Sequence, residues 1–340
     1  MKQKILFMMI DMNVGGTEKA FLNLVSEIDF TKYDVTLLLL EEKGGFLKDV
    51  PNEVQIETLE NYEQIKDEIM LPPLVCAKKA MHIKKYLKAV GILFYHIIFK
   101  ISNDRTSYYK YIIRKLKKKE GYDVAIAFAG PMEFITTYIL EKVEANKKIQ
   151  WIHFDISKNG TNLKHARRNY PKFNKIFVVS DQAKQILIDA IPSIDKITET
   201  KQNVVSEAAC LKLAEVGETY RNYDGIKILT VGRLYREKGQ DIIPEVARQL
   251  KKEGYDFKWY LIGEGSIRKE IEKEIEEYEL KDTVILLGTK TNPYRFYKDA
   301  TIYVQTSRQE GFGITIAEAK VFKLPIVSTD VAGAREQLKE

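Results

Sequence analysis

Residues 307–319 read Ser-Arg-Gln-Glu-Gly-Phe-Gly-Ile-Thr-Ile-Ala-Glu-Ala, and this stretch says most about the fold. It follows a short apolar run typical of a buried strand, and its second half has the pattern of an apolar helix. Glu310 closes the intervening loop, while Gly311 and Gly313 leave backbone amides bare at the start of the helix. Glu318 falls about one turn inside the helix, where a buried carboxylate needs a hydroxyl or cationic partner. The stretch predicts a strand–loop–helix unit with polar groups at the carboxyl end of the strand.

The same alternation of short β-branched runs with helical patterns continues along the whole chain. It is the signature of parallel sheets covered by helices. The expected strands are 4–10, 34–40, 54–59, 123–128, 148–153, 175–180, 226–231, 257–262, 283–287, 301–305 and 325–328, and the expected helices include 17–28, 240–253 and 267–278. The strand signal lapses between Gln202 and Tyr223. We therefore expect an α/β protein of two Rossmann-like, doubly wound domains, 1–205 and 206–340, facing a cleft.

The composition excludes several classes of protein. The 340 residues are 45% hydrophobic and 30% charged, without low-complexity or disordered bias. Two cysteines and four histidines are too few for a disulfide scaffold and leave little for a zinc site. The apolar N-terminal stretch stops at Asp11, and the longest uncharged run, 89–99, falls short of the ~20 residues that span a bilayer. The sequence predicts a soluble cytoplasmic protein without a metal centre.

One segment, 78–119, carries all of the basic excess. It contains 13 Lys or Arg and one acid, Asp104, a charge of +12 against −6 for the rest of the chain. An apolar stripe at helical spacing runs through it: Ile83, Leu87, Val90, Phe94, Ile97 and Ile101. A second helix is expected at about 108–119. Two interpretations stay open: a basic amphipathic surface that docks on anionic lipid, or two helices that cover their sheet and expose a charged face. Nucleic-acid binding is a third interpretation with less support, because no known nucleic-acid-binding module accompanies the positive charge.

Two glycine loops bear on ligand binding. Gly15-Gly16 follows the first expected strand and opens a helix, so the backbone can approach a ligand and free amides can attract phosphate. The loop lacks the third glycine of the dinucleotide fingerprint. Gly263-Glu264-Gly265 is also incomplete, because Arg268 stands where that fingerprint has glycine. A nicotinamide dehydrogenase is therefore disfavoured.

A cationic pair follows the first strand of the second half. Residues 232–239 read Gly-Arg-Leu-Tyr-Arg-Glu-Lys-Gly and precede a helix. Arg233 and Lys238 should therefore emerge at the carboxyl end of the strand. A planar guanidinium and a point-charge ammonium together suit a diphosphate. The alternative is ordinary surface pairing with Glu237.

Together these motifs resemble the retaining glycosyltransferases of family 4, glycosyl transferases group 1, of the bacterial polysaccharide-biosynthesis type. The resemblance rests on Glu310 and Glu318 with seven residues between them, preceded by Gly-Arg-x-x-x-x-Lys-Gly and by Gly15-Gly16. Residues 330–336 also look like the family's loop after the next strand. The resemblance implies the GT-B fold, in which a nucleotide-sugar lies between two Rossmann-like domains.

The resemblance also implies residue roles. Arg233 and Lys238 would neutralise the donor diphosphate, Glu310 would contact the transferred sugar, and Glu318 the ribose hydroxyls. His153, at the end of an expected strand, matches the family's histidine near the anomeric carbon. The implied catalytic residues are His153, Glu310, Arg233 and Lys238. The implied donor-binding residues are Gly15, Gly16, Gly232, Arg233, Lys238, Glu310, Gly311, Phe312, Gly313 and Glu318.

The expected chemistry needs no metal and no resident cofactor, since the nucleotide-sugar is a substrate. No Asp-x-Asp occurs in the chain, so the cations would do the work of magnesium at the departing diphosphate. No carboxylate pair stands out as a double-displacement nucleophile. The acceptor would then attack the face of the sugar from which the diphosphate leaves, so that the anomeric configuration is retained. The departing phosphate oxygen would accept the proton of the acceptor hydroxyl.

The expected activity is transfer of a hexose or N-acetylhexosamine from a UDP-sugar to a saccharide, plausibly lipid-linked, in capsule, exopolysaccharide or cell-wall polymer assembly. The protein would be cytoplasmic, with a peripheral position on the inner face of the cell membrane through 78–119. Two alternatives are a non-catalytic GT-B-like partner subunit and a UDP-sugar 2-epimerase, and the spacing of Glu310 and Glu318 speaks against the epimerase. Family members continue past the 333–336 loop into a last strand and helix, whereas this sequence stops at Glu340, so we expect a truncated second domain.

Overall fold

The computed structural model describes residues 2–130, 132–157, 160–220 and 223–338. The chain divides into two compact units. Unit 1 comprises Met1–Asn13 and Ile28–Lys201, and unit 2 comprises Val14–Glu27 and Gln202–Glu340. The first helix, α1 (Gly16–Ser26), thus groups with unit 2 although it follows the first strand of unit 1. Residues 1 and 340, the outer limits of the two predicted domains, lie outside the described residues.

Unit 1 contains a seven-stranded parallel sheet in the order β3-β2-β1-β4-β5-β6-β7. Its strands are β1 (Gln3–Met9), β2 (Tyr33–Leu39), β3 (Val54–Thr58), β4 (Lys119–Gly130), β5 (Val143–Ile152), β6 (Lys175–Val178) and β7 (Thr198–Thr200). Phe7 of β1 lies opposite Leu37 of β2 and Ile126 of β4. The order reverses between β1 and β4, which defines a doubly wound sheet with its switch point there.

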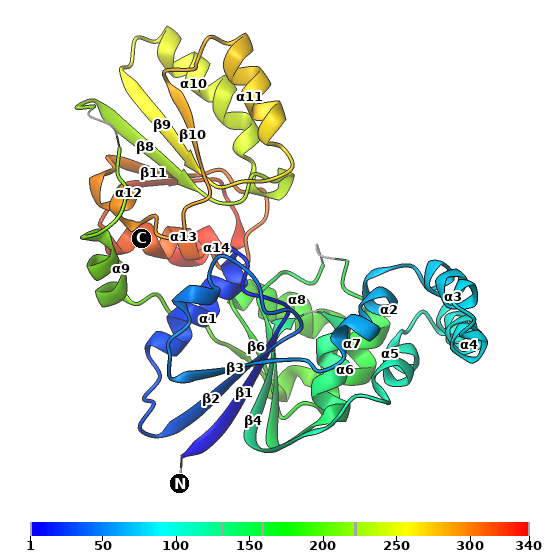
Figure 1. Cartoon of the computed structure of the whole chain (residues 1–340). Coiled ribbons are helices and arrows are strands. Elements are labelled where there is room, and N and C mark those ends of the chain that lie inside the picture. Colours follow the sequence, from blue (N-terminus) through cyan, green and yellow to red (C-terminus); the bar gives the residue numbers. More distant parts are fainter. Residues whose placement is uncertain (1, 131, 158–159, 221–222, 339–340) are drawn as a thin grey trace. The chain divides into compact units, whose positions relative to one another are not determined.

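Helices cover the sheet of unit 1, because its central strands are apolar on both faces. The helices are α2 (Lys66–Met70), α3 (Pro73–His82), α4 (Tyr86–Ser102), α5 (Thr106–Ile113), α6 (Glu133–Lys142), α7 (Leu163–Asn169) and α8 (Asp181–Ala190), with 3₁₀ turns η1 (Leu47–Asp49), η2 (Tyr62–Gln64), η3 (Tyr170–Lys172) and η4 (Pro192–Ile197). One core cluster extends from Leu6 and Met8 of β1 to Phe134 of α6 and Leu187 of α8. In Figure 1, α3 and α4 lie at the end of unit 1 away from its sheet.

Unit 2 contains a five-stranded parallel sheet in the order β10-β9-β8-β11-β12. Its strands are β8 (Ile226–Val231), β9 (Phe257–Ile262), β10 (Val284–Gly288), β11 (Ile302–Gln305) and β12 (Ile326–Ser328). Its other elements are α9 (Glu207–Ala214), η5 (Arg236–Lys238), η6 (Gln240–Ile242), α10 (Ile243–Lys252), α11 (Arg268–Glu277), α12 (Tyr294–Asp299), α13 (Ile314–Val321) and α14 (Ala332–Gln337). One core contains residues of α9, α12 and α13, and a second contains residues of α10 and α11. The sheet is therefore covered on both faces, and its order reverses between β8 and β11.

The predicted α/β class with two doubly wound parallel sheets is confirmed, and each predicted strand overlaps an observed one. The sequence prediction missed β7, which is three residues long and polar (Thr-Glu-Thr) at the edge of its sheet. Residues 330–336, expected as a loop, instead enter α14.

The prediction for the basic segment needs correction. The sequence places the stripe on one helix from Ile83 onward, but Lys84 has a left-handed φ of 58°. The helix α3 therefore ends at His82, Ile83 is its C-cap, and α4 begins at Tyr86. The helix expected at 108–119 ends at Ile113, because Lys119 already pairs in the sheet as the first residue of β4. Of the described helices, none is long and apolar enough to cross a bilayer.

Candidate functional site

The candidate site of unit 2 lies where the strand order reverses. The loop after β8 and the loop after β11 leave neighbouring parallel strands at the same edge of the sheet. In open α/β sheets, ligands bind at this position, outside the carboxyl ends of the strands. The two loops carry both halves of the predicted donor site, which are 72 positions apart in sequence.

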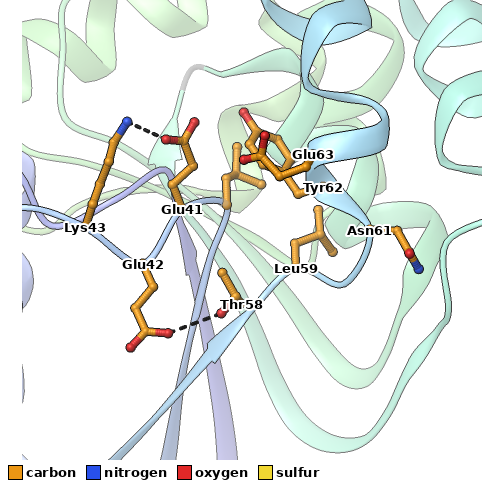
Figure 2. Close-up of a pocket in the computed structure, with 9 residues that line it drawn as sticks. Glu41, Glu42, Lys43, Thr58, Leu59, Asn61, Tyr62 and Glu63 are labelled. Atoms are coloured by element: carbon orange, nitrogen blue, oxygen red, sulfur yellow. Dashed lines mark hydrogen bonds and ion pairs between the residues drawn. The ribbon is translucent and has the colours of Figure 1, made fainter.

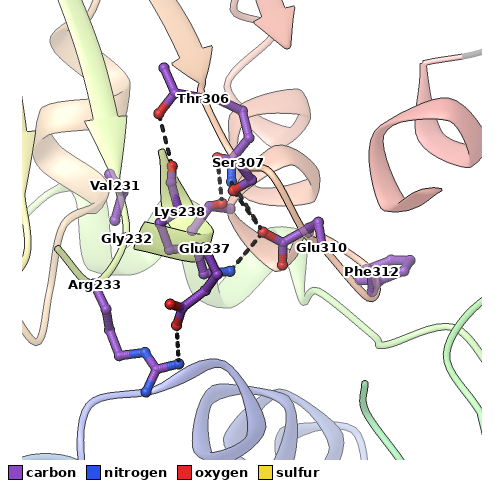
Figure 3. Close-up of polar contacts among 12 residues, drawn as sticks. Val231, Gly232, Arg233, Glu237, Lys238, Thr306, Ser307, Glu310 and Phe312 are labelled. Carbon is purple, nitrogen blue, oxygen red and sulfur yellow. Dashed lines mark hydrogen bonds and ion pairs between the residues drawn. The ribbon is translucent and has the colours of Figure 1, made fainter. Parts of the chain in front are cut away.

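Lys238 and Glu310 form the centre of this arrangement. The Lys238 ammonium donates to Oε2 of Glu310 at 2.7 Å, and Figure 3 shows the two side chains pointing toward each other. The same carboxylate oxygen accepts from Oγ of Ser307 at 3.1 Å and from Nε2 of Gln305 at 3.2 Å. Gln305 is itself oriented, because its Oε1 accepts from the buried hydroxyl of Tyr303 at 2.5 Å. Glu310 is thus held by three donors, one of them a cation.

Backbone contacts join the two loops. Oγ1 of Thr306 donates to the carbonyl of Lys238 at 2.9 Å, and the amide of Arg308 donates to the carbonyl of Glu237 at 2.9 Å. Gly239 has a φ of 68°, and a β-carbon there would lie 2.0 Å from the carbonyl oxygen of Thr306. Only glycine therefore allows this close approach, which fixes where Lys238 emerges.

An ion pair between Arg308 and Asp241 also joins the loop after β11 to the segment after β8. The Arg308 guanidinium donates to both carboxylate oxygens of Asp241, at 2.6 and 2.8 Å. These hydrogen bonds hold the pKa of Asp241 below its ordinary value. Arg236 also contacts Asp241, at 3.1 Å, so this surface is a small ionic network.

Arg233 lies at the same edge but is more open than Lys238. Its side chain is 52% exposed, contacts Oε1 of Glu237 at 3.4 Å, and lies 5.0 Å from the ring centroid of Tyr235. The surface pairing with Glu237 that the sequence left open is therefore present (Figure 3). Exposed pairs of this length contribute roughly 0–1 kcal/mol, so the guanidinium can exchange Glu237 for an anionic ligand.

Glu318 is buried, with 3% of its surface exposed, and it has the hydroxyl partners that a buried acid requires. The hydroxyl of Tyr294 donates to its Oε1 at 2.8 Å, and that of Tyr297 donates to its Oε2 at 3.3 Å. Burial raises the pKa of Glu318, and the nearby Lys19 charge and the tyrosine hydroxyls oppose that rise. In this structure Glu318 therefore links α13 to α12.

Residues of α14 contact the backbone of the Gly-Phe-Gly turn and fix its position. Gly313 is the N-cap of α13 with a φ of 84°, and Nε2 of Gln337 donates to its carbonyl at 3.2 Å. A β-carbon on Gly333 would lie 2.3 Å from the carbonyl oxygen of Phe312. Gly311 is half-buried in the same turn. Gly333 thus allows α14 to pack directly under the backbone that the sequence predicted would face the ligand.

The other predicted glycines lie at element junctions. Gly232 directly follows β8, and its amide donates to the carbonyl of Ile262 at 2.9 Å. Gly15 is the N-cap of α1 in extended backbone, and a β-carbon on Gly16 would meet nothing within 4 Å. Within unit 2, the ammonium of Lys19 on α1 lies 4.9 Å from the ring centroid of Tyr294. The start of α1 therefore groups with the helices that hold Glu318.

His153 belongs to unit 1, directly after β5. Its ring is buried, lies 4.5 Å from that of Phe128, and stacks on Trp151 with 5.9 Å between centroids. Unit 2 brings together Arg233, Lys238 and Glu310, with Glu318 and the Gly-Phe-Gly turn. The relation of His153 to these groups stays a prediction.

Unit 1 also has a hollow at the carboxyl ends of β2 and β3 (Figure 2). Its volume is about 380 Å³, and its lining comes from Leu40, Glu41, Glu42, Lys43, Thr58, Leu59, Asn61, Tyr62 and Glu63. Lys66 pairs with Oε1 of Glu41 at 3.0 Å, and Oγ1 of Thr58 donates to Glu42 at 3.3 Å. The sequence did not predict this pocket, because its residues come from two strand ends without a recognisable motif.

Sequence reasoning also assigned no role to Gln305, Ser307, Tyr294 and Tyr297, which position the two predicted glutamates. One signal was available. Gln305 is a polar residue at the carboxyl end of an otherwise apolar buried strand, which is where ligand-site residues of α/β sheets lie. The tyrosines lie on α12, 21 and 24 positions before Glu318, and nothing local to them indicates that contact.

Two doubly wound parallel sheets, each with its switch point at the carboxyl edge, define the GT-B class of fold. A crystal structure of a Staphylococcus aureus TarM mutant, in complex with Fondaparinux, alpha-GlcNAc-glycerol and UDP, has a TM-score of 0.69 to this chain. The two are 16% identical, and the match covers 99% of this chain and 88% of that one. This likeness shows the fold.

Sequence comparisons then point to a particular kind of protein. The family "Glycosyl transferases group 1" matches residues 217–340. An uncharacterized glycosyltransferase of Methanocaldococcus jannaschii is 28% identical over 179 residues, covering 51% of this chain and 44% of that protein. The N-acetylgalactosamine-N,N'-diacetylbacillosaminyl-diphospho-undecaprenol 4-alpha-N-acetylgalactosaminyltransferase of Campylobacter jejuni is 24% identical over 348 residues, covering 98% and 83%. For most of its curated relatives, including the M. jannaschii protein, the match covers less than two thirds of the relative's own length. The chain therefore has glycosyltransferase homologues, and its residues 217–340 match the group 1 family.

Proposed function

We propose that this protein is a retaining glycosyltransferase of the group 1 type. It moves a hexose or N-acetylhexosamine from a nucleotide-sugar, a UDP-sugar, to a saccharide acceptor. Residues 1–205 form the acceptor side and residues 206–340 the donor side. The observation that carries this proposal is the contact between Lys238 and Glu310, which joins the two donor motifs at the switch point of unit 2. UDP in the complex with the S. aureus neighbour supports the choice of base.

The donor diphosphate lies against the two cations of the loop after β8. Arg233 offers a planar fork and Lys238 a point charge, and both stabilise the negative charge that develops on the departing diphosphate. Backbone amides at the start of α13 and near Gly15-Gly16 add further stabilisation of this negative charge. The cations supply the charge that a divalent metal supplies in other transferases, so the reaction proceeds without one.

Glu310 contacts the transferred sugar, and Glu318 contacts the ribose hydroxyls. The bond from the anomeric carbon to the diphosphate oxygen breaks, and a bond to the acceptor oxygen forms on the same face of the sugar. The acceptor hydroxyl gives its proton to the departing phosphate oxygen. His153 acts beside the anomeric carbon, the role that the family resemblance implies for it. Lys238 is held by Glu310 before the donor arrives, so its position requires no reorganisation during the reaction.

The acceptor is a lipid-linked saccharide in the assembly of capsule, exopolysaccharide or a cell-wall polymer, at the inner face of the cell membrane. The name of the C. jejuni relative, which includes a diphospho-undecaprenol, supports this class. The hollow at the ends of β2 and β3 offers carboxylate acceptors and the Asn61 amide to sugar hydroxyls.

A donor assay tests the proposal. The full chain is incubated with UDP- and GDP-sugars, with and without saccharide acceptors, and release of the nucleoside diphosphate is measured. UDP release with at least one UDP-sugar is expected. Absence of release with every donor would exclude the transferase and favour the non-catalytic partner subunit. Conversion of a UDP-sugar to its C2 epimer without an acceptor would favour the epimerase.

A further inference from the structure

The exposed hydrophobic side chains of this protein gather on one helical hairpin. Eleven of the twenty-three large hydrophobic side chains that are exposed in the described part of the chain lie between Met70 and Ile101, in under a tenth of the sequence. On α4 they form a stripe at steps of three and four residues, which we call the α4 stripe: Leu87, Val90, Phe94, Ile97 and Ile101. Each is more than half exposed, and Leu87 reaches 90%. Scattered apolar residues are normal on a surface, but a continuous stripe marks an interaction site.

The opposite side of α4 is already packed. Ala89 and Ile92 are buried, and a β-carbon on Gly91 would lie 2.1 Å from the hydroxyl of Tyr111 on α5. The ring of Tyr95 lies 4.8 Å from that of Tyr111. The helix is therefore held in unit 1 by α3 and α5, and the α4 stripe takes no part in the core. Covering the protein's own sheet, the alternative that the sequence left open, does not explain these residues.

Exposed basic side chains lie on the same hairpin as the stripe. Lys84 and Lys85 precede α4, Lys100 lies on the helix beside the stripe, and Lys78 lies on the exposed face of α3. All four are exposed, and none forms an ion pair with another described residue. By contrast, Lys88 pairs with Glu68 and Lys79 with Asp67, on the side where the hairpin meets the rest of unit 1. Exposed lysines that form no ion pair with another described residue therefore lie on α3 and near both ends of α4, the helix that carries the stripe.

We propose that the α4 stripe and these four lysines form a docking surface for a bilayer of anionic lipids. A helix lying in the plane of the interface buries an apolar face among acyl chains while lysine stems reach the head groups. The 17 residues of α4 give a cylinder about 25 Å long, which suits a position along the surface. This proposal is argued from the exposed surface of the hairpin and does not depend on the proposed transferase activity.

Charge decides between a membrane and a second copy of the chain. A symmetric pair of hairpins would bring the exposed lysines of both copies closer together, and like charges at close range repel. Anionic head groups meet the same lysines with opposite charge. The composition of the surface therefore favours lipid.

The hairpin that carries the docking surface also contacts the segment that lines the pocket of unit 1. Nζ of Lys88, at the start of α4, donates to the carbonyl of Gln64, directly after the pocket residue Glu63. Lys66 on α2 pairs with the pocket residue Glu41. If the proposed function holds, an acceptor whose lipid stays in the bilayer can present its sugar to this pocket.

Vesicle sedimentation of the full chain tests the proposal. Vesicles of phosphatidylcholine alone are compared with vesicles of equal parts phosphatidylcholine and phosphatidylglycerol. The expected result is binding to the anionic vesicles that is roughly tenfold or more tighter than to neutral ones. The triple variant Leu87→Gln/Phe94→Gln/Ile101→Gln should lose roughly tenfold or more of that binding, because three apolar side chains no longer enter the bilayer. The variant Lys84→Gln/Lys85→Gln/Lys100→Gln should lose the preference for anionic lipid.

A matched control removes three exposed apolar side chains elsewhere: Val246→Gln/Tyr255→Gln/Val327→Gln should bind vesicles as the parent does. Unchanged unfolding temperature and unchanged UDP binding in the stripe variant exclude misfolding. Binding that the stripe variant retains would overturn the proposal. So would a parent dimer, seen by light scattering, that the stripe substitutions dissociate, since a second copy would then cover the surface. A chain that binds vesicles but releases no UDP leaves the docking intact and removes only the proposed transferase.

Discussion

The ammonium of Lys238 lies 2.7 Å from the carboxylate of Glu310, across the two loops that leave β8 and β11. Both side chains are largely buried, with 21% and 13% of the side-chain surface exposed. Before a donor binds, each side chain thus neutralises the other, and Ser307 and Gln305 complete the hydrogen bonds of the carboxylate. A diphosphate that reaches Lys238 meets a cation that is already positioned, while Glu310 stays within reach of the sugar.

The substitution Lys238→Met tests the role of the positive charge. It keeps the apolar stem and removes the ammonium, so the developing charge on the diphosphate loses a preorganised partner. We expect kcat/KM for UDP release to fall by about 100-fold or more, the usual effect of removing one such group. As control, Lys281→Met removes another lysine that pairs with a carboxylate, that of Glu276 at 2.6 Å, on an exposed surface. Equal turnover in the two variants would contradict the diphosphate role of Lys238.

The guanidinium of Arg233 is expected to donate two parallel hydrogen bonds to phosphate oxygens, in addition to supplying a positive charge. Arg233→Ala should lower kcat/KM for UDP release by about 10- to 100-fold, and Arg233→Lys should recover only part of the loss because an ammonium cannot bind two phosphate oxygens in parallel. The unfolding free energy should stay within about 0.5 kcal/mol in both, since the pair with Glu237 is exposed. Glu237→Gln, which removes that pair, should leave UDP affinity unchanged or raised. A loss of affinity in Glu237→Gln would show that the pair itself forms the site.

Glu318 should matter for stability as well as for the donor. Glu318→Ala removes the carboxylate that accepts from the hydroxyls of Tyr294 and Tyr297, leaves Tyr297 with the carbonyl of Thr315 as acceptor, and opens a cavity, for a cost of about 3 kcal/mol. Glu318→Gln keeps the volume and one acceptor oxygen, so we expect about 1 kcal/mol. Urea unfolding followed by Trp259 fluorescence in a Trp151→Phe background reports unit 2 selectively. Equal stability of both variants and the parent would show that the carboxylate does not hold α12 to α13.

Much of the fold was predictable because its signals are local. A buried parallel strand such as β9 is a short run of mostly apolar residues, and its bounds were predicted to the residue. The short edge strand β7 has no such run, and its pairing with β6 decides its structure. Lys84 gives no local sign of its left-handed backbone, so the break between α3 and α4 was not predictable.

The candidate site divides in the same way. Lys238 and Glu310 were predicted from motifs, since glycines and charges at fixed spacing mark the loops. Tyr294 and Tyr297 were missed, because their contact with Glu318 depends on how α12 packs against α13. Which face of α4 is buried was likewise left open. Apolar residues lie on both sides of that helix, and only packing against α5 leaves the α4 stripe uncovered.

A buried acid in unit 1 predicts a pH dependence of stability. Glu133 lies in the first turn of α6, and its Oε2 is buried without a hydrogen-bond partner among the described residues. Burial raises the pKa of Glu133 from 4.5 to about 7, and the Arg105 charge opposes this rise while Asp104 adds to it. The folded protein therefore binds a proton that the unfolded chain releases between these two values. Stability from this group is fully present below pH 4.5 and is lost as the pH rises through about 7.

The variant Glu133→Gln should remove that loss, because a neutral amide stays uncharged at every pH. Relative to the parent, we expect it to gain on the order of 1–3 kcal/mol in unfolding free energy between about pH 5 and about pH 8. Urea unfolding followed by Trp151 fluorescence in a Trp259→Phe background reports unit 1. The nearby His165, whose pKa burial lowers to about 4, gives the opposite slope between that value and 6.5, and it is common to both proteins. If the difference between the two curves did not change with pH, Glu133 would be as readily ionised in the folded protein as in the unfolded chain.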